Sequence, residues 1–91
     1  MRAARRVYGM KIRKVSHITR DGKPKLVVFL DDNYVAMADR CDHSKVRVGL
    51  QVVRVWKSKA DKNVWVLDLD NGGWITVKDG WLYKADPELC D

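Results

Sequence analysis

Apolar and polar residues alternate with a period of two along much of the chain, most clearly over residues 64–77. In the first part of this segment Trp65 and Leu67 fall on one side and Asp68 on the other, which is typical of a half-buried β-strand. Asn71-Gly72-Gly73 then supplies residues that tolerate positive φ angles, and the alternation resumes directly after them. The segment is therefore predicted to be a β-hairpin.

The same pattern over the whole chain predicts an all-β domain. We expect strands near residues 11–19, 25–31, 34–38, 46–58, 63–69, 73–78 and 81–84. Short strands separated by turn residues are typical of a small six- to seven-stranded barrel or sandwich, here of SH3-like or OB-like size. Residues 34–38 allow a second interpretation, because Ala and Met favour helices and Asp32 is a suitable helix cap.

A weaker copy of the hairpin precedes it in the chain. A shift of 38 positions lays residues 26–33 over residues 64–71, and after a gap of two residues in the turn, residues 34–39 fall on residues 74–79. Any two hairpins share alternating apolar residues, but a gap that lies in a turn and restores the match on both sides favours duplication. The repeat argues for a strand at 34–38 and predicts two tandem three-stranded meanders.

The chain is expected to form a single domain, because its 91 residues match the size of one small domain. Its predicted parts are a flexible basic arm with room for one helical turn (1–9), a first meander (10–39), a polar linker (40–45), a second meander (46–84) and an acidic tail (85–91). The more uniformly apolar side of each meander is predicted to form the core, namely Val27, Phe29, Val35 and Met37 in the first and Trp65, Leu67, Ile75 and Val77 in the second. The other side, which faces outward or lines a groove, carries Tyr34, Trp56, Trp74 and Thr76.

Positive charge is concentrated at the N-terminal end. The whole chain has a formal net charge of +6, whereas residues 1–25 hold nine Lys or Arg and one Asp, a net charge of +8. Residues 26–91 hold nine basic and eleven acidic residues, a net charge of −2. A field of this kind attracts polyanions, of which nucleic acid is the commonest in a cytoplasm, and a solubilising N-terminal tail is the alternative interpretation.

Basic residues interleaved with aromatic residues indicate how such a polyanion is held. Lys and Arg contact phosphates, and exposed rings stack on bases, with about 1 to 3 kcal/mol for each stacked base. The residues predicted to bind nucleic acid are Arg2, Arg5, Arg6, Lys11, Arg13, Lys14, Lys23, Lys25, Tyr34, Arg54, Trp56, Lys57 and Trp74. The leading hypothesis is a non-catalytic protein that binds DNA or RNA. The alternative is a protein-interaction module, an inhibitor or accessory protein that acts through an aromatic patch or a strand edge.

Other chemistry has little support in the sequence. The chain has two His and five Ser or Thr residues, without the pattern of a catalytic triad, and it has no Gly-rich phosphate loop before a helix. No enzyme activity and no cofactor are therefore expected. No metal is expected either, because His17, Cys41, His43 and Cys90 lack the spacing of zinc ligands and residues 68–73 are explained by a hairpin turn better than by a calcium loop.

The location expected from the sequence is the cytoplasm. No apolar run approaches the roughly 20 residues of a membrane-spanning helix, and the basic N-terminus lacks the apolar region of a signal peptide. No membrane association is predicted. Two cysteines, Cys41 and Cys90, are too few for a secreted disulfide scaffold, so both are expected to be reduced thiols.

Overall fold

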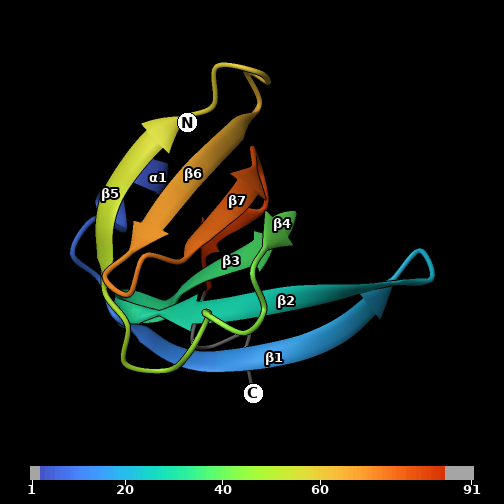
Figure 1. The fold of residues 1–91 in the computed structure, drawn as a ribbon, viewed down its shortest axis with the longest axis horizontal. Coiled ribbons are helices and arrows are strands. Elements are labelled where there is room, and N and C mark those ends of the chain that lie inside the picture. The colour runs from blue at the N-terminus through green and yellow to red at the C-terminus, as the bar shows by residue number, and fades with distance from the viewer. Residues whose placement is uncertain (1–2, 86–91) are drawn as a thin grey trace.

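The computed structural model describes residues 3–85 as two four-stranded antiparallel sheets around one hydrophobic core (Figure 1). The elements are α1 (Ala3–Arg6), β1 (Ile12–Arg20), β2 (Lys23–Leu30), the 3₁₀ turn η1 (Asp31–Asn33), β3 (Tyr34–Ala38), β4 (Arg40–Cys41), β5 (Val52–Lys57), β6 (Val64–Leu69), β7 (Trp74–Lys78) and β8 (Leu82–Lys84). The expected all-β class is confirmed. Within residues 3–85, no helix has the length and apolar character needed to span a membrane.

The order of the strands links the two halves of the chain. One sheet has the order β1-β2-β3-β8 and the other has the order β4-β7-β6-β5. Each sheet thus consists of three consecutive strands plus the strand that follows the other three, since β8 pairs with β3 and β4 pairs with β7. A bridge between Lys11 and Gln51 also joins the start of β1 to the residue before β5. Neither half of the chain completes its own sheet.

All seven expected strands are present, and all but the one at 34–38 have changed ends. β3 occupies residues 34–38, so the helical interpretation of this segment is wrong. The short strand β4 was missed, because its two residues fall in the predicted linker. Residues 46–51 were expected to open a long strand but lie outside β5. Gly49 in this segment has a φ of +94°, a left-handed conformation that suits glycine and interrupts a strand.

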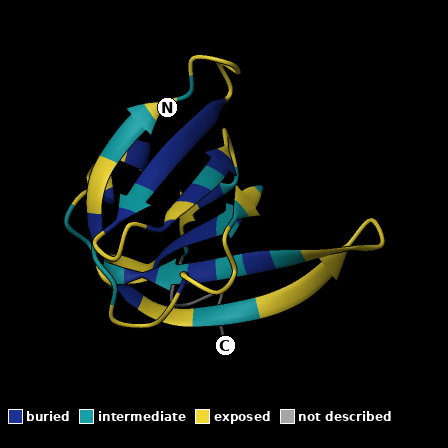
Figure 2. Cartoon of the chain, in the orientation of Figure 1, coloured by how far each residue is buried: buried dark blue, intermediate teal, exposed yellow. Residues whose placement is uncertain are grey.

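The core of the second meander lies on the predicted face. Its buried residues Trp65, Leu67, Ile75 and Val77 all belong to the continuous hydrophobic cluster. Strand β6 is mostly dark blue in Figure 2 because its outward residues Val64 and Val66 are buried as well.

The core of the first meander lies mainly on the face opposite to the predicted one. Strand β2 contributes Leu26, Val28 and Leu30, whereas the predicted Val27 and Phe29 are only half-buried. Strand β3 contributes Tyr34, Ala36 and Ala38 to the cluster. Of the two predicted residues of this strand, Val35 is buried but lies outside the cluster, and Met37 is half-buried. The prediction for Val27, Phe29 and Met37 is therefore wrong.

A one-residue register slip explains the error. Val28 lies opposite Ala36 in β2–β3, as Leu67 lies opposite Ile75 in β6–β7, and both members of the second pair come 39 residues after those of the first. Alternate residues of a strand point to opposite faces, so a slip of one position exchanges the inside and the outside. The 38-residue shift thus carried the core face of the second meander onto the outer face of β2.

The described part of the N-terminal segment packs on the domain. α1 is the single helical turn for which the predicted arm left room, and Ala4 and Val7 are fully buried. The backbone N–H of Gly9 donates to the carbonyl of Val52 at 2.8 Å, and the N–H of Val52 donates to the carbonyl of Met10 at 2.9 Å. The cations of residues 3–9 therefore project from a segment that is hydrogen-bonded to β5.

A tight turn joins β2 to β3 at the expected position. Asp32 and Asn33 both adopt left-handed backbone conformations, with φ values of +58° and +64°. Asp and Asn tolerate this region better than most residues. The turn places two polar side chains at the edge of the cavity described below.

Candidate nucleic-acid interface

A row of basic, aromatic and aliphatic side chains crosses the outer face of the β1-β2-β3-β8 sheet. Lys14 lies opposite Phe29, Phe29 opposite Val35, and Val35 opposite Tyr83. Residues opposite one another on neighbouring strands share a face. Val28, the chain neighbour of Phe29, is fully buried in the core, so the row points away from the core. Tyr83 is 52% exposed at its end.

A second row runs beside the first, where Ser16 lies opposite Val27 and Val27 opposite Met37. The backbone N–H of Met37 donates to the carbonyl of Trp81 at 2.9 Å, which sets Trp81 next to this row. Arg20 reaches the same place from the β1–β2 hairpin, with Nη1 3.7 Å from the sulfur of Met37. The outer face of this sheet is therefore apolar in its middle and basic at its margin.

Three cations surround the indole of Trp81. The charged groups of Arg20, Lys25 and Lys78 lie 5.4, 5.8 and 5.0 Å from the ring centre. One carboxylate, Asp39, lies 3.7 Å from the amines of both Lys25 and Lys78. Three positive charges against one negative charge leave this aromatic site positive, which favours a ligand with both a planar ring and a phosphate.

Two cavities that share lining residues follow these rows. The larger has a volume of about 1250 Å³, and its lining includes four aromatic residues and three cations: Tyr8, Phe29, Tyr34, Tyr83, Arg6, Arg13 and Lys84. The smaller has a volume of about 370 Å³, and its lining includes Arg20, Met37, Trp81 and Tyr83. Val35 and Tyr83 line both cavities, so they form one surface. We call this surface the aromatic groove and define it by Arg6, Tyr8, Arg13, Lys14, Arg20, Phe29, Tyr34, Trp81, Tyr83 and Lys84.

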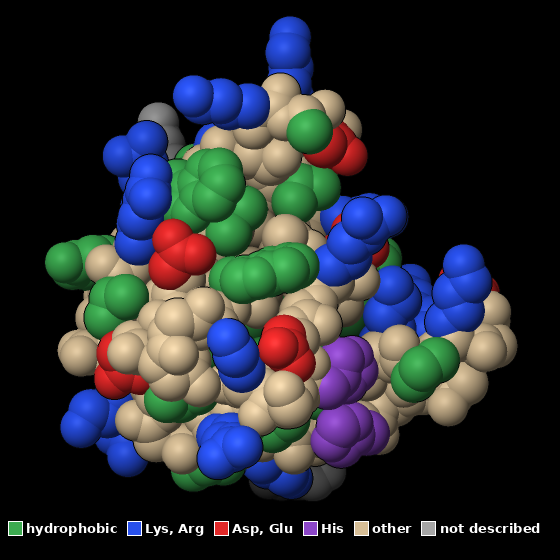
Figure 3. Space-filling view, in the orientation of Figure 1, with side chains coloured by type: hydrophobic (Ala, Val, Ile, Leu, Met, Phe, Trp, Pro, Cys, Tyr) green, Lys and Arg blue, Asp and Glu red, His purple; other side chains and the backbone are tan. Residues whose placement is uncertain are grey.

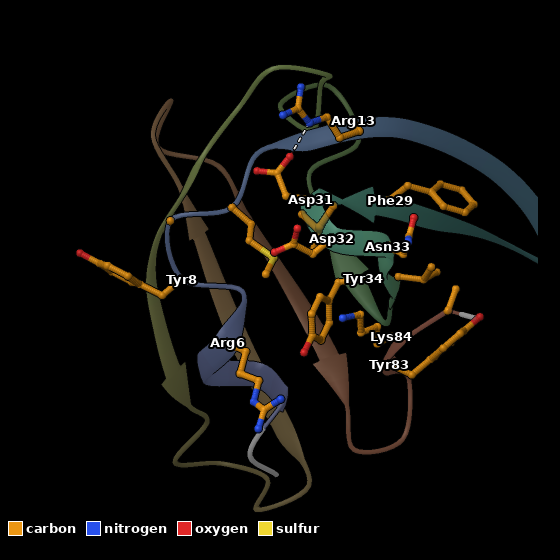
Figure 4. A pocket seen from close by; sticks show the side chains of 15 residues that line it. Arg6, Tyr8, Arg13, Phe29, Asp31, Asp32, Asn33, Tyr34, Tyr83 and Lys84 are labelled. Atoms are coloured by element: carbon orange, nitrogen blue, oxygen red, sulfur yellow. Dashed lines mark hydrogen bonds and ion pairs between the residues drawn. The ribbon is translucent and has the colours of Figure 1, made fainter. Parts of the chain in front are cut away.

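Segments that are distant in the sequence build the wider end of the aromatic groove (Figure 4). Arg6 and Tyr8 lie on one side of the cavity, and Phe29 and Tyr83 lie on the other. Tyr34 lies between them and is only 7% exposed, so little of its ring reaches the cavity. The wider end therefore offers rings from the N-terminal segment, β2 and β8 to a ligand.

Two carboxylates line the same end, and they differ in their surroundings. The backbone N–H of Lys11 donates to Oδ2 of Asp31 at 3.0 Å, and Arg13 forms an ion pair with its Oδ1. These two donors hold the pKa of Asp31 below its usual value, so the group stays ionised with its charge balanced by Arg13. Within residues 3–85, the carboxylate of Asp32 has neither a hydrogen-bond donor nor an ion-pair partner.

The structure does not bring all the residues predicted to bind nucleic acid together on one face. Those in or beside the aromatic groove are Arg6, Arg13, Lys14, Lys25 and Tyr34. Lys23 lies at the exposed end of the β1–β2 hairpin, which extends from the body in Figure 1 and is yellow in Figure 2. Lys11 is exposed next to Ile12, the first residue of β1. Arg2 lies outside the described residues.

Trp56, Trp74 and Arg54 lie instead on the outer face of the second sheet. Asp68 lies opposite both Arg54 and Trp74, and its Oδ2 accepts a hydrogen bond of 2.9 Å from the indole N–H of Trp56. Figure 3 shows hydrophobic side chains gathered over the region of β5, β6 and β7, with Lys and Arg at their margin. We call this surface the tryptophan face and define it by Arg54, Trp56, Val66, Asp68 and Trp74.

Arg5 and Lys57 belong to neither surface. Their charged groups lie 5.9 and 5.6 Å from the ring centre of Trp65, which is 4% exposed and part of the core. The indole N–H of Trp65 donates to Asp79 at 3.1 Å. These two cations thus lie over a core side chain.

The sequence reasoning missed several residues of the aromatic groove, namely Tyr8, Arg20, Phe29, Trp81, Tyr83 and Lys84. Phe29 was assigned to the core because of the register slip, and an offset of 39 would have placed it outside. Arg20 belongs to the basic segment 1–25, and its position on the β1–β2 hairpin would have been enough to place it in the groove. Trp81, Tyr83 and Lys84 reach the groove because β8 joins the other sheet, and no local pattern encodes that pairing.

The described residues show no arrangement suited to a metal ion. Residues 3–85 contain no cluster of three or more His, Cys, Asp or Glu that could hold one. The rings of His17 and His43 stack with centres 6.1 Å apart, as the purple pair in Figure 3. Cys41 is half-buried, and burial, with the nearby charge of Asp42, raises the pKa of its thiol. Cys90 lies outside the described residues.

Comparisons with protein-family models, with curated proteins and with solved structures find no significant match for this chain.

Proposed function

We propose that this chain is a non-catalytic nucleic-acid-binding protein whose aromatic groove holds a single strand of DNA or RNA. The observation that carries the proposal is the joining of rings and cations on one surface, where the exposed Tyr83 and the half-buried Phe29 and Trp81 lie with Lys14, Arg20 and Lys84. Proteins that bind single strands combine a basic groove, which follows the phosphates, with rings on which successive bases stack.

Single strands fit this surface better than duplexes do. The bases of a duplex are stacked inside it, so the rings of Phe29 and Tyr83 have no base face to contact there. A duplex meets only the cations of the groove, and this term depends on salt and not on base sequence. We therefore expect a single strand to bind more tightly than a duplex of the same length.

A second candidate function is favoured by the tryptophan face. Trp56 lies opposite Val66 of β6, and Trp74 lies opposite Asp68, which comes two residues after Val66 on β6. Trp74 is 39% exposed, and the guanidinium of Arg54 lies 5.2 Å from the ring centre of Trp56. Exposed Trp beside Arg is typical of the centre of protein interfaces. This surface supports the protein-interaction alternative and lies on a different sheet from the aromatic groove.

The proposed function is tested by titrating a labelled single strand of about twelve nucleotides, within the usual site sizes, at several salt concentrations. One variant replaces Arg6, Lys14, Arg20 and Lys84 with Gln. Each phosphate contact that is lost should flatten the slope of log affinity against log salt by about 0.7, so the groove variant should bind more weakly and with a smaller slope than the wild type.

A matched variant replaces four cations outside the groove, Lys45, Arg47, Lys59 and Lys62, with Gln. It loses the same net charge, so it separates local contacts from the general field of the protein. Equal losses of affinity in the two variants would contradict the aromatic groove as the binding site. No binding of any oligonucleotide by folded wild-type protein at about 50 mM salt, where phosphate contacts are strong, would leave only the protein-interaction alternative.

We also infer that the two meanders are copies of one unit. Ile12 lies opposite Leu30 in β1–β2, and Val52 lies opposite Leu69 in β5–β6, with an irregularity of register after each pair. These positions correspond at offsets of 40 and 39 residues, close to the offset of 39 in the β2–β3 and β6–β7 pairs. At these offsets the outer face of one sheet corresponds to the outer face of the other. The aromatic groove and the tryptophan face are then diverged versions of one surface.

A further inference from the structure

One side chain in the wider end of the aromatic groove does not suit a phosphate. Asp32 lines the cavity and is exposed, and within residues 3–85 no cation lies within ion-pair distance of its carboxylate. The neighbouring Asp31 differs, because Arg13 and the backbone N–H of Lys11 occupy its oxygens. A carboxylate that is not neutralised repels phosphate, so this point of the groove favours a ligand group that donates hydrogen bonds.

Nucleobases carry such donors on their edges, and guanine matches a carboxylate best. Its Watson–Crick edge presents two adjacent N–H donors, on N1 and on the exocyclic N2, which reach both oxygens of one carboxylate. Adenine and cytosine present a single amino group there, and thymine and uracil present one N–H between two carbonyls. Unstacked bases in a single strand expose this edge to the protein.

The surroundings of Asp32 supply the other contacts that a guanine needs. Asn33 follows Asp32 in the same turn and also lines the cavity, and its side-chain amide is a donor for the O6 carbonyl of guanine. In Figure 4 Phe29, Asn33 and Tyr83 lie on one side of the cavity, and Asp32 lies between that side and Tyr8. The two rings offer stacking surfaces beside the polar turn.

We propose that the turn Asp32-Asn33 reads a guanine base of the bound strand, so that the aromatic groove prefers single strands that contain guanine. This inference rests on the proposed function. Asp32 accepts the N1–H and N2–H donors, Asn33 donates to O6, and Phe29 or Tyr83 stacks on the base. The cations of the groove hold the flanking phosphates and carry no base preference.

The test compares three labelled strands of about twelve nucleotides: all thymine, thymine with one central guanine, and the same strand with inosine, which lacks the N2 amino group. A single guanine avoids the four-stranded structures of guanine runs. We expect the guanine strand to bind about tenfold more tightly than the all-thymine strand, since a matched bidentate contact gives roughly five- to a hundredfold discrimination. Inosine should lie between the two.

The decisive variant is Asp32→Asn, because Asn tolerates the left-handed conformation and keeps the shape of the side chain. It should reduce the guanine preference to within about twofold, and it should leave the affinity for the all-thymine strand equal or higher, because it removes a negative charge from the groove. Asp21→Asn is the matched control. Asp21 has a φ of +54° in the β1–β2 turn and loses the same charge, but its replacement should leave the ratio between strands unchanged.

The outcomes separate this inference from the proposed function. A wild-type protein that binds all-thymine and guanine strands equally well has no guanine pocket, although the groove still binds nucleic acid. A preference that persists in Asp32→Asn places the reading of the base elsewhere and overturns the role of the turn. No binding of any of the three strands by folded protein ends the proposed function itself.

Discussion

Lys14 and Phe29 lie opposite each other on β1 and β2, with the amine of Lys14 5.4 Å from the centre of the Phe29 ring. The pair faces away from the core, so the cation covers a ring that would otherwise meet water. A flexible ammonium group can turn from the ring to a phosphate, and the uncovered ring can then stack on the adjacent base. The pair thus combines the two kinds of contact that a single strand needs.

Stacking on this face is tested by Phe29→Leu and Tyr83→Ala. Leu keeps apolar bulk on β2 but has no π-face, and Tyr83 is 52% exposed, so both variants should fold. We expect each to weaken the binding of a single strand by about 1 to 3 kcal/mol per lost base stack while the salt slope stays unchanged. Anisotropy titrations against a fluorescent strand measure both quantities.

Trp74→Ala is the counterpart on the tryptophan face. The sequence alone assigned stacking to Trp56 and Trp74, whereas the aromatic groove lies on the other sheet. Trp74→Ala should therefore leave the affinity for a single strand near that of the wild type. A loss with Trp74→Ala and none with Phe29→Leu would move the binding site to the tryptophan face.

The orientation of β2 is tested by a pair of neighbouring valines. Val28 is fully buried in the core, whereas Val27 is half-buried on the outer face. Val28→Ala should lower the free energy of unfolding by about 2 kcal/mol or more, since it removes buried methyl groups and leaves a cavity, and Val27→Ala should cost less than about 1 kcal/mol. Urea unfolding followed by Trp fluorescence measures both, and the reverse order would restore the face predicted from the 38-residue shift.

The ionised state of Asp31 should contribute to stability above acid pH. Its pKa in the folded state is lowered by the Lys11 N–H and by Arg13, so folding favours the charged form. The contribution is fully present above the pKa of the unfolded carboxyl, about 3.9, and is lost as the pH falls through the lower pKa of the folded state.

Comparison with Asp31→Asn checks this sign. The variant should be less stable than the wild type by a constant amount between about pH 5 and pH 7, and the difference should shrink below about pH 4. Unfolding curves at several pH values give the difference directly. A deficit that grows toward acid pH would contradict the assigned role of the carboxylate.

Cys41 should react slowly with thiol reagents in the folded protein. Burial and the charge of Asp42 raise the pKa of its thiol, so at neutral pH even less of the reactive thiolate is present than in an ordinary cysteine, with a pKa of about 8.5. The variant Cys90→Ser isolates this thiol. Its labelling rate at pH 7.5 should rise on addition of urea, and a folded-state rate equal to that of a small model thiol would show that Cys41 is neither buried nor perturbed.

The alternation of residues was enough to predict every strand except the short β4, but it could not predict how the strands pair over long distances. Turn residues such as Gly72 and Asp32 mark the hairpins because their backbone conformations are local properties. The face of β2 was ambiguous, since Val27 and Phe29 on one side are as apolar as Leu26 and Val28 on the other, and only packing against the second sheet decides between them.

The site was harder to predict than the strands for the same reason. Positive charge in the first 25 residues is visible in the sequence, and it indicated part of the groove, including Arg6, Arg13 and Lys14. The aromatic partners were not visible, because Tyr83 and Trp81 come from the end of the chain and meet β3 only through long-range pairing. Trp56 and Trp74 were chosen because they fall on the side of their strands opposite to the predicted core, and this local pattern does not show which sheet a residue joins.

The exchange of β4 and β8 between the sheets has a consequence for how the domain is assembled. The third strand of each meander finds its outer neighbour in the other half of the chain, and Tyr34 pairs with Lys84 fifty positions away. Such distant pairing slows folding, because the chain must close a long loop before either sheet is complete. It also makes the two halves of the chain depend on each other. A cut in the loop between Cys41 and Val52 would yield two peptides that gain their full structure only by associating. Each peptide would then supply the fourth strand of the other peptide's sheet.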